Sequence, residues 1–449
     1  MKKYLAVFLV VLFVLSFAVA AFAEDKPEIT IGGELRVRGW YVENINDNTA
    51  TYLPGETESQ AWYDQRLRLN VNAKIADNTS AFVQLESTNE KEARNSDTYT
   101  WGSWNQKPSS ELTFRQAYIQ HSGSGLLGVP VGIKVGHMLL ALGEKQFLDH
   151  TKFGDDAIVL WTDPMKELHI GLVTAKAFET NKTKHGDDVD AYMLLGTYKI
   201  DKDNTIGLNY TLIKSDASNL DSVGVDSLDF QNLGLHANGN ISGLSYAFEG
   251  DIQFGDLQMK ATEDASFKGY GLMLKLGYML DPVNIRGSFA MGSGDDDATD
   301  NDNSEFQTTM GRDMHYTFIY EYTVKSAANY QKIAVTNDPG GRATGIANTT
   351  YFNLGIDYSP VKDLNMSLDG FMLQATETAG IPNVLKPGKE VDDNLGWEVD
   401  FKTSYKIVKN LTYFVQAGYF DSGDFYQDVM GKDQNKGVTQ LMHGLQLDF

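Results

Sequence analysis

Apolar and polar residues alternate with a period of two through most of this 449-residue chain. Residues 62–76 are typical, because Leu67 and Leu69 alternate there with Arg66 and Arg68. Successive side chains of a β-strand point to opposite faces, so such a segment has one apolar face and one polar face. The same pattern recurs over residues 28–42, 244–254 and 397–406. A chain built from such strands is expected to close into a barrel with lipid outside and polar side chains inside.

The connections between the expected strands are alternately short and long. Turn-forming residues make the short ones, for example at 77–79, 163–165 and 281–282, whereas segments such as 180–187 and 376–393 are long. In barrels of this kind short turns lie on the periplasmic side and long loops lie outside. Counting in this way predicts an all-β, transmembrane, antiparallel up-and-down β-barrel of about 18 strands, with 16 to 20 possible.

One segment disturbs the count. Residues Met314 to Val324 look like a strand, and counting them alone would break the alternation of turns and loops. Pairing them with Tyr330 to Thr336 would give 20 strands, but that partner is shorter than the roughly nine to eleven residues a spanning strand needs. We therefore expect 18 strands and a single long external loop over about 293–348, and the sequence leaves open whether this loop folds inward as a constriction or stands outside as a binding surface.

The sequence at each end of the chain is typical of an outer-membrane protein. Residues 1–23 carry two lysines, an apolar run and Ala21-Phe22-Ala23, which predicts a cleaved signal peptide and a single barrel domain over 24–449. The last strand alternates up to Phe449, as strands of bacterial outer-membrane barrels usually do. We expect a location in the cell outer membrane of a Gram-negative bacterium, contact with its lipid and lipopolysaccharide, and recognition by the barrel-assembly machinery through Phe449.

Composition and motifs argue against several other functions. The net charge of −22 does not suit nucleic acid binding, and the absence of cysteine removes disulfides and thiolate chemistry. His121-Ser122-Gly123-Ser124-Gly125 lacks the first glycine of a hydrolase G-x-S-x-G motif. The acidic segment from Asp295 has Asp300 and Phe306 where a calcium loop needs Gly and Glu, so it is expected to be a solvated loop. We expect no enzyme activity, catalytic residue, metal site or cofactor.

A row of basic residues on the inward faces of the first five strands is the strongest functional signal. Guanidinium groups in rows suit solutes that carry carboxylate or phosphate groups. Acidic residues are interleaved with them, so a salt-bridge network that stiffens the wall is an equally weighted interpretation, and both can hold. The candidate pore-lining residues are Arg36, Arg38, Arg66, Arg68, Arg115 and Lys134, together with Glu34, Asp64 and Glu86.

At these residues the chain resembles alginate-export-type porins. The similarity is clearest over Ile29 to Trp161, in Arg-x-Arg of the first strand, in residues 63–69 and 84–86, in Phe114-Arg115-Gln116-Ala117-Tyr118, and in residues 133–136 leading into 142–148. The resemblance implies an 18-stranded monomeric barrel whose arginine-lined pore passes an anionic polysaccharide or small anions. His137 departs from the pattern, because such proteins tend to carry arginine after the glycine.

The expected function is therefore passive diffusion of small hydrophilic solutes, anionic or saccharide, through a water-filled lumen. The alternative is a surface-binding or adhesin barrel that acts through its long external loops. Selectivity also stays open at this point, because inward acidic residues could outweigh the basic row and leave a weakly cation-selective pore. The acidic residues in question are Glu34, Asp64, Glu86, Glu249, Asp251, Glu398 and Asp400.

Overall fold

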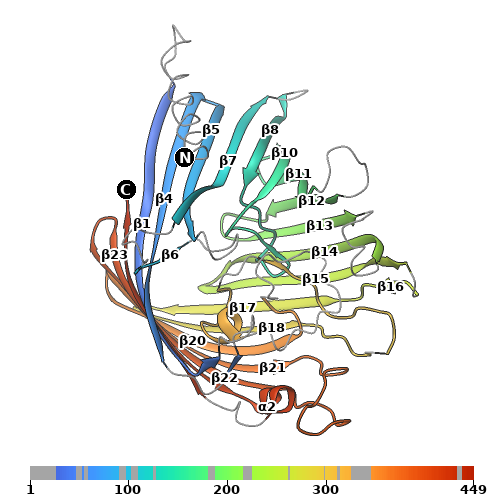
Figure 1. Cartoon of the computed structure of the whole chain (residues 1–449). Helices are drawn as coiled ribbons and strands as arrows, with labels where there is room; N and C mark the ends of the chain where they lie inside the picture. The colour runs from blue at the N-terminus through green and yellow to red at the C-terminus, as the bar shows by residue number, and fades with distance from the viewer. Residues whose placement is uncertain are drawn as a thin grey trace.

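In the computed structural model the chain forms one closed antiparallel barrel of 18 strands (Figure 1). Each strand pairs with the next along the chain, and β1 closes the barrel by pairing with β24, so the first strands (blue) lie beside the last (red). The expected fold and strand number are confirmed. The strands are β1 (Glu28–Glu43), β4 (Gln60–Ala76), β5 (Thr79–Asn89), β7 (Ser110–Ser124), β8 (Pro130–Met138), β10 (Asp155–Met165), β11 (Leu168–Phe178), β12 (Val189–Lys199), β13 (Thr205–Ser215), β14 (Val225–Ile241), β15 (Leu244–Met259), β17 (Tyr270–Leu280), β18 (Val283–Gly292), β20 (Thr349–Val361), β21 (Leu364–Ala375), β22 (Asn394–Val408), β23 (Leu411–Ser422) and β24 (Gly437–Asp448).

The structure describes residues 27–46, 53–54, 59–89, 98–102, 110–124, 128–179, 188–215, 225–260, 263–297, 299–310, 314–324, 345–431 and 437–449. The expected signal peptide at 1–23 and the segment Tyr330 to Thr336 lie outside these residues. Within them, no helix is long and apolar enough to cross a membrane.

Short turns and long connections alternate along the barrel as the sequence predicts. Residues 77–78, 242–243 and 409–410 join neighbouring strands at one end, whereas 44–59 and 376–393 lie at the other. By the usual rule for outer-membrane barrels the first end is periplasmic and the second is external.

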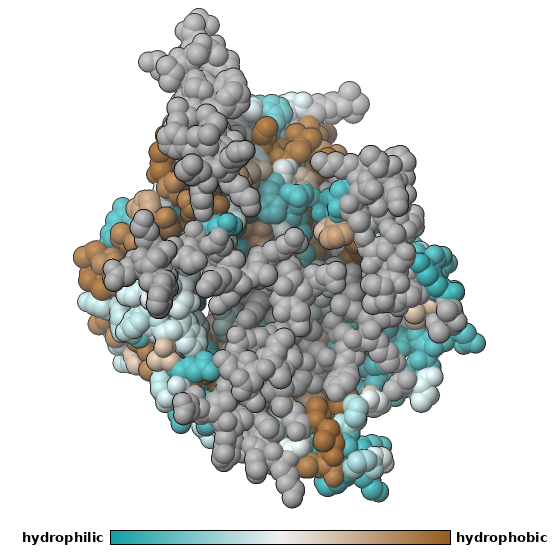
Figure 2. All heavy atoms as spheres, in the orientation of Figure 1, coloured by the Kyte–Doolittle hydropathy of each residue, from teal (hydrophilic) through white to brown (hydrophobic). Residues whose placement is uncertain are grey.

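The outer face of the wall is apolar and aromatic. Apolar strand residues such as Leu172, Leu354 and Trp397 are exposed on the barrel surface. In Figure 2 hydrophobic residues (brown) gather at the top of the view, over β5–β8. Tyr198 and Tyr278 are exposed near the periplasmic strand ends, which agrees with an aromatic belt at the membrane interface.

The inner face is not polar throughout, which differs from the expected polar lumen. Toward the external end its residues become apolar, as at Trp40 and Val42 after the arginines of β1. An apolar wall cannot face water at little cost, so it must be covered. Buried inner-wall residues that need such cover include Ala157, Val173, Met193, Ile213, Phe230, Tyr351, Phe371 and Phe420.

Two connections fold inward and cover this apolar wall. The first inner loop, residues 139–154, buries Leu142, Phe147 and Leu148, and the Phe147 ring lies 6.0 Å from that of Phe230. The second inner loop is the connection 293–348, whose described parts bury Phe318 and Ile319 against the opposite side of the wall.

The second inner loop answers two questions that the sequence left open. The connection 293–348 was expected to be a long external loop that could also fold inward, and its described parts enter the lumen because apolar residues such as Phe306 and Phe318 pack on the inner wall. The strand-like segment Met314 to Val324 is no strand: it ends in a π-helical turn, η3 (Tyr320–Val324). Its apolar residues are buried on the inner wall, so their spacing reflects that packing.

Candidate functional site

The arginines of the basic row lie on the inner wall of β1, β4 and β7, and their carboxylate partners lie on β1, β4 and β5. Antiparallel register places Arg38 opposite Asp64, and Arg68 opposite both Glu34 and Glu86. The Arg38 guanidinium donates to both Asp64 oxygens, at 2.9 Å from Nε and 2.7 Å from Nη2. Two parallel bonds of this kind orient the guanidinium as well as neutralising part of its charge.

The same register places Arg66 directly opposite Arg36, and like charges at directly paired positions repel each other. The side chain of Arg66 instead reaches diagonally to Glu34, with Nε and Nη2 at 2.8 and 2.5 Å from Oε1. Arg68 donates to Glu86 Oε2 at 2.5 Å, and its Nη1 lies 3.8 Å from Glu34 Oε2. The arginines and carboxylates therefore form a connected network across the wall.

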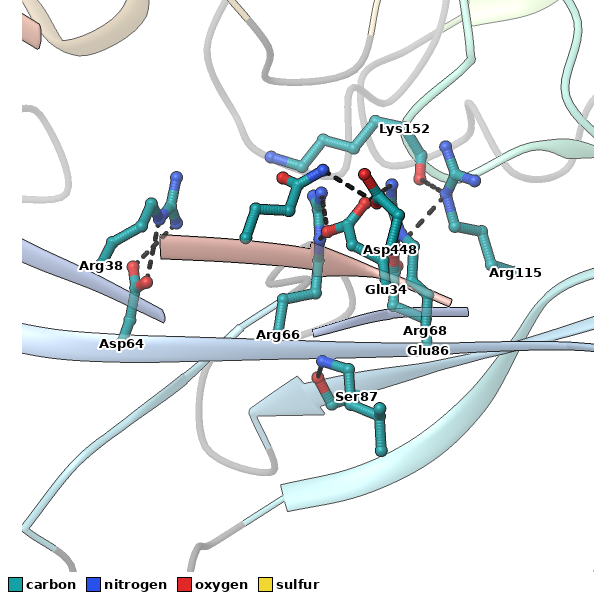
Figure 3. Close-up of polar contacts among 12 residues, drawn as sticks. Glu34, Arg38, Asp64, Arg66, Arg68, Glu86, Ser87, Arg115, Lys152 and Asp448 are labelled. Carbon is teal, nitrogen blue, oxygen red and sulfur yellow. Dashed lines mark hydrogen bonds and ion pairs between the residues drawn. The ribbon is translucent and has the colours of Figure 1, made fainter. Parts of the chain in front are cut away.

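Arg115 joins this network to the first inner loop. Its Nε lies 3.5 Å from Glu86 Oε2 and donates to the Lys152 carbonyl at 3.0 Å, while Nη2 donates to the Thr151 carbonyl. In Figure 3 the side chains of Arg66, Arg68 and Arg115 point to the same side of the strands, toward Lys152. The basic wall consequently has both strand and loop members.

Lys134 stands apart from these contacts. It lies on β8 nearer the periplasmic end, and its Nζ is 3.9 Å from the centroid of the Tyr118 ring. A cation over an aromatic face is held there electrostatically. Of the nine sequence-predicted residues, the structure brings the five arginines and three carboxylates to one wall and leaves Lys134 beside an aromatic ring.

The two inner loops are joined across the lumen. β9 (Leu148–Asp149) of the first loop pairs in parallel with β19 (Thr309–Met310) of the second. His150 Nε2 lies 2.7 Å from Thr309 Oγ1, and the amide of Thr309 donates to the Phe147 carbonyl at 2.8 Å. The loops thus form one structure inside the barrel.

His315 is the charged centre of this junction. Its Nδ1 lies 2.8 Å from Glu321 Oε1, and its Nε2 lies 3.5 Å from Asp149 Oδ2. Burial opposes the charged imidazolium, but Glu321 and Asp149 outweigh burial and raise the pKa of His315 to about 10. Burial also acts against the Asp149 carboxylate, yet His315 and Thr151 hold its pKa below the ordinary value. His315 is thus charged at neutral pH and links the two loops.

Comparison with known proteins identifies the family. A family model described as alginate export matches residues 28–440. The chain belongs to the alginate export family. No curated protein sequence matches it.

Solved structures similar to this alginate export family member all have the same kind of fold. Pseudomonas aeruginosa OpdL has a TM-score of 0.55 at 11% identity, covering 93% of this chain and 98% of that one. OccK8 (OprE) of the same organism has a TM-score of 0.52 at 12% identity, covering 96% and 100%. OccK10 (OpdN) has a TM-score of 0.51 at 13% identity, covering 93% and 99%. At such low identity these likenesses show the fold alone.

The family and the closed barrel together identify a porin-type channel of the outer membrane. The family resemblance inferred from residues 29–161 is therefore confirmed, and so is the expected location. Sequence reasoning missed Lys152 and His315, because neither lies in a periodic segment and only long-range loop packing brings them into the lumen.

Proposed function

We propose that this porin passes small hydrophilic anions, carboxylate-bearing solutes among them, along the arginine-lined wall. The observation that carries the proposal is the balance of charge on that wall. Five arginines of this wall share the carboxylates of Glu34, Asp64 and Glu86, and Asp448 lies opposite Glu34 on β24 as a fourth carboxylate, so these residues together keep one positive charge in excess (Figure 3). Rings and rows of Arg and Lys favour anions in pores.

The acidic residues of the other walls support the same selectivity. Glu249, Asp251, Glu398 and Asp400 point inward, but each is at most 2% exposed beneath an inner loop. A charge covered by protein interacts with a passing ion less than one that lines the water path, and nearby compensation weakens it further. They are four of the seven carboxylates on which the opposing expectation of a cation-selective pore relied.

The inner loops favour small solutes over a polymer. Both loops occupy the lumen and contact each other, which narrows the space for a hydrated polysaccharide chain. The alginate export family name supports a solute with carboxylate groups. Short uronate oligomers and simple carboxylates are therefore the substrates to test first.

Reversal potentials in a KCl gradient test the proposal. The wild type is expected to be anion-selective, and Arg66→Ala combined with Arg68→Ala should move the reversal potential toward the cation side. Lys268→Ala is the matched control, because it removes an exposed external lysine that is screened beyond about 8–10 Å at physiological salt. Heat-modifiable gel mobility should be retained in all three proteins, as evidence that the barrel is folded.

Two outcomes would overturn the proposal. Cation selectivity in the wild type, or an unchanged reversal potential in the double variant, would leave the arginines as wall-stiffening partners only. Absence of any conductance from folded protein would favour the surface-binding alternative.

A further inference from the structure

The sequence Glu-x-Asp occurs on two distant strands with its carboxylates inward. One pair is Glu249 and Asp251 on β15, and the other is Glu398 and Asp400 on β22. All four side chains are buried, and each pair lies beneath a different inner loop. Among the described residues none of the four forms an ion pair with the arginine wall, so their contacts with the loops are the relevant ones.

The pair on β22 binds the backbone of the second inner loop. The amides of Ile319 and Tyr320 donate to Glu398 Oε1 and Oε2 at 2.6 and 2.7 Å. The amide of Phe318 donates to Asp400 Oδ2 at 3.0 Å. Three consecutive amides are thus held by two carboxyl groups of the barrel wall.

On β15, Glu249 binds the backbone of the first inner loop, and Asp251 binds the neighbouring wall strand. The amide of Gln146 donates to Glu249 Oε2 at 3.3 Å. Gly143 has a φ of +53° and lies so close that a Cβ there would be 2.7 Å from Glu249 Oε1. Asp251 is held from the other side by Asn232, whose amide nitrogen donates to Oδ1 at 2.8 Å.

The same strand also reaches the second inner loop. Two residues beyond Asp251, the amide group of Gln253 exchanges two bonds of 2.7 Å with the backbone of Gln307. β15 therefore anchors both loops, and β22 anchors the second loop at its far side.

These contacts satisfy two physical requirements at once. A buried loop has amides that no sheet ladder satisfies, and an unpaired buried amide is costly. A buried carboxylate is likewise costly unless several donors surround it. The β22 pair accepts from three loop amides and Glu249 accepts from one, whereas Glu249 Oε1, Asp251 Oδ2 and Asp400 Oδ1 have no hydrogen-bond partner among the described residues. The bonds that form stabilise one particular loop position.

We propose that the two Glu-x-Asp pairs are positioning residues that fix the inner loops across the lumen and thereby set the size limit for solutes. The proposal rests on the porin-type channel function. It predicts that neutralising a pair widens the channel, because the released loop no longer fills the same part of the lumen.

The test uses Glu398→Gln combined with Asp400→Asn in the full-length protein. An amide side chain keeps the shape but turns an NH₂ group toward backbone donors, so the three loop bonds cannot all form. Single-channel conductance is expected to rise about two-fold, because pore diameter governs permeation. Liposome-swelling assays should show entry of neutral saccharides that the wild type excludes.

Asp369→Asn is the matched control. Asp369 lies directly opposite Asp400 on the neighbouring strand and is also inward, but it accepts from Arg286 and Asn353 rather than from a loop backbone. Arg286 keeps Asp357 as a partner in this variant. Its conductance and solute limit should stay at wild-type values.

A cysteine tether provides a second, independent measurement. The chain has no cysteine, so Ile319→Cys with Gly418→Cys introduces one defined pair. A Cβ on Gly418 would lie 3.0 Å from Ile319 Cδ1, which places the two positions in contact, and 2.7 Å from Asp400 Oδ1. The two cysteines in the wild-type background, with the pair reduced, are therefore the reference for the effect of the cysteines themselves. In the Glu398→Gln, Asp400→Asn background, oxidation of this pair should restore wild-type conductance and reduction should raise it again.

The outcomes separate this inference from the proposed anion selectivity. Unchanged conductance and solute limit in the folded double variant, or no effect of the tether on the widened channel, would overturn the positioning role. Reversal potentials test the arginine wall instead, so a channel that widens without being anion-selective would overturn only the proposed function.

Discussion

The inward-facing acidic residues form two groups that differ in their hydrogen-bond partners. Glu34, Asp64 and Glu86 accept from arginines on neighbouring strands, whereas Glu398 and Asp400 accept from loop amides. In the proposed function, the first group shapes the electrostatic field along the water path. The second group mainly offsets the cost of burying loop backbone. Two inward acids of the same type can therefore contribute to transport in different ways.

The alternation of side chains predicted that all of these residues face inward, and it could not predict what each one contacts. Strand register, which depends on the turns, determines that Arg38 meets Asp64 and that Arg66 turns to Glu34. The arginine network was accessible from the sequence because neighbours along the chain are neighbours in the barrel. The loop contacts join Glu398 to Ile319 and Tyr320, nearly eighty residues away, and no local pattern encodes them.

His315 gives a prediction about pH. Its pKa is raised from 6.5 to about 10, so its contribution to stability is fully present below pH 6.5 and is lost as the pH rises toward 10. Deprotonation would leave Glu321 and Asp149 facing each other near a neutral ring. We expect channel noise and loop opening to increase above about pH 9 to 10 in single-channel recordings of the wild type.

His315→Gln is the comparison for this prediction. It should show the increased opening already at pH 7, with little further change up to pH 10, because the imidazolium whose charge is lost over this range is absent. Lys202→Ala, which changes an exposed lysine in the turn between β12 and β13, outside both inner loops, should keep the wild-type pH profile. A His315→Gln channel whose pH profile matches the wild type would show that the histidine does not join the loops.

The strands and the inner loops of the barrel differ in how directly the sequence specifies them. Alternation, turn residues and the order of long and short connections predicted all 18 strands, and the observed bounds differ by a few residues. The inward course of residues 139–154 was not predicted, and that of the described parts of 293–348 was left open, because a loop that packs on an inner wall has no periodicity of its own. The apolar end of the inner face, as at Trp40 and Val42, is the sequence signal that such a cover is required.

Phe147→Ala tests whether packing holds the first inner loop. Phe147 is 1% exposed, and its ring lies against Phe230 of the wall. Removing such a side chain costs about 3–5 kcal/mol, which here weakens docking of the loop because the strand ladders stay intact. Hydrogen exchange of residues 139–154 should become faster, while the amides of β10–β14 stay protected.

The control for loop packing is Phe178→Ala at the exposed end of β11. It removes the same side chain from a position that does not contact the loop core, so exchange over 139–154 should match the wild type. Equal exchange in Phe147→Ala and the wild type would mean that hydrogen bonds alone, such as those to Glu249, hold the loop.

The molecule as a whole is one continuous ladder that has no free edge. Each of the 18 barrel strands has two neighbours, and closure of the barrel depends on the pairing of β1 with β24. Closure satisfies the backbone groups that lipid cannot, which is the reason an alternating chain of this length is expected to form a barrel. The described parts of the two inner loops occupy space that the strands alone leave open. The strands therefore determine the fold, and in our proposal the loops set the width of the channel.

Variants of Phe449 test the pairing of β1 with β24, at which the barrel closes. The amide of Phe449 donates to the Gly33 carbonyl at 3.0 Å, and its carbonyl accepts from the Gly33 amide at 2.7 Å. Its ring lies where a Cβ on Gly33 would be only 2.7 Å away, so glycine leaves the space that the ring occupies. Deleting Phe449 removes both bonds and the ring, and it should lower the temperature at which folded barrel is lost on heat-modifiable gels.

Two substitutions at the same position separate the backbone contribution from that of the ring. Phe449→Tyr keeps both and should behave as the wild type, whereas Phe449→Ala keeps the backbone bonds and should fall between the wild type and the deletion. Each neutral hydrogen bond contributes about 1 kcal/mol, so the difference between Phe449→Ala and the deletion should be measurable in urea titrations of refolded protein. If the deletion and the wild type lose the folded barrel at the same temperature, closure does not depend on this residue, and the remaining β1–β24 pairs from Glu34 onward are sufficient.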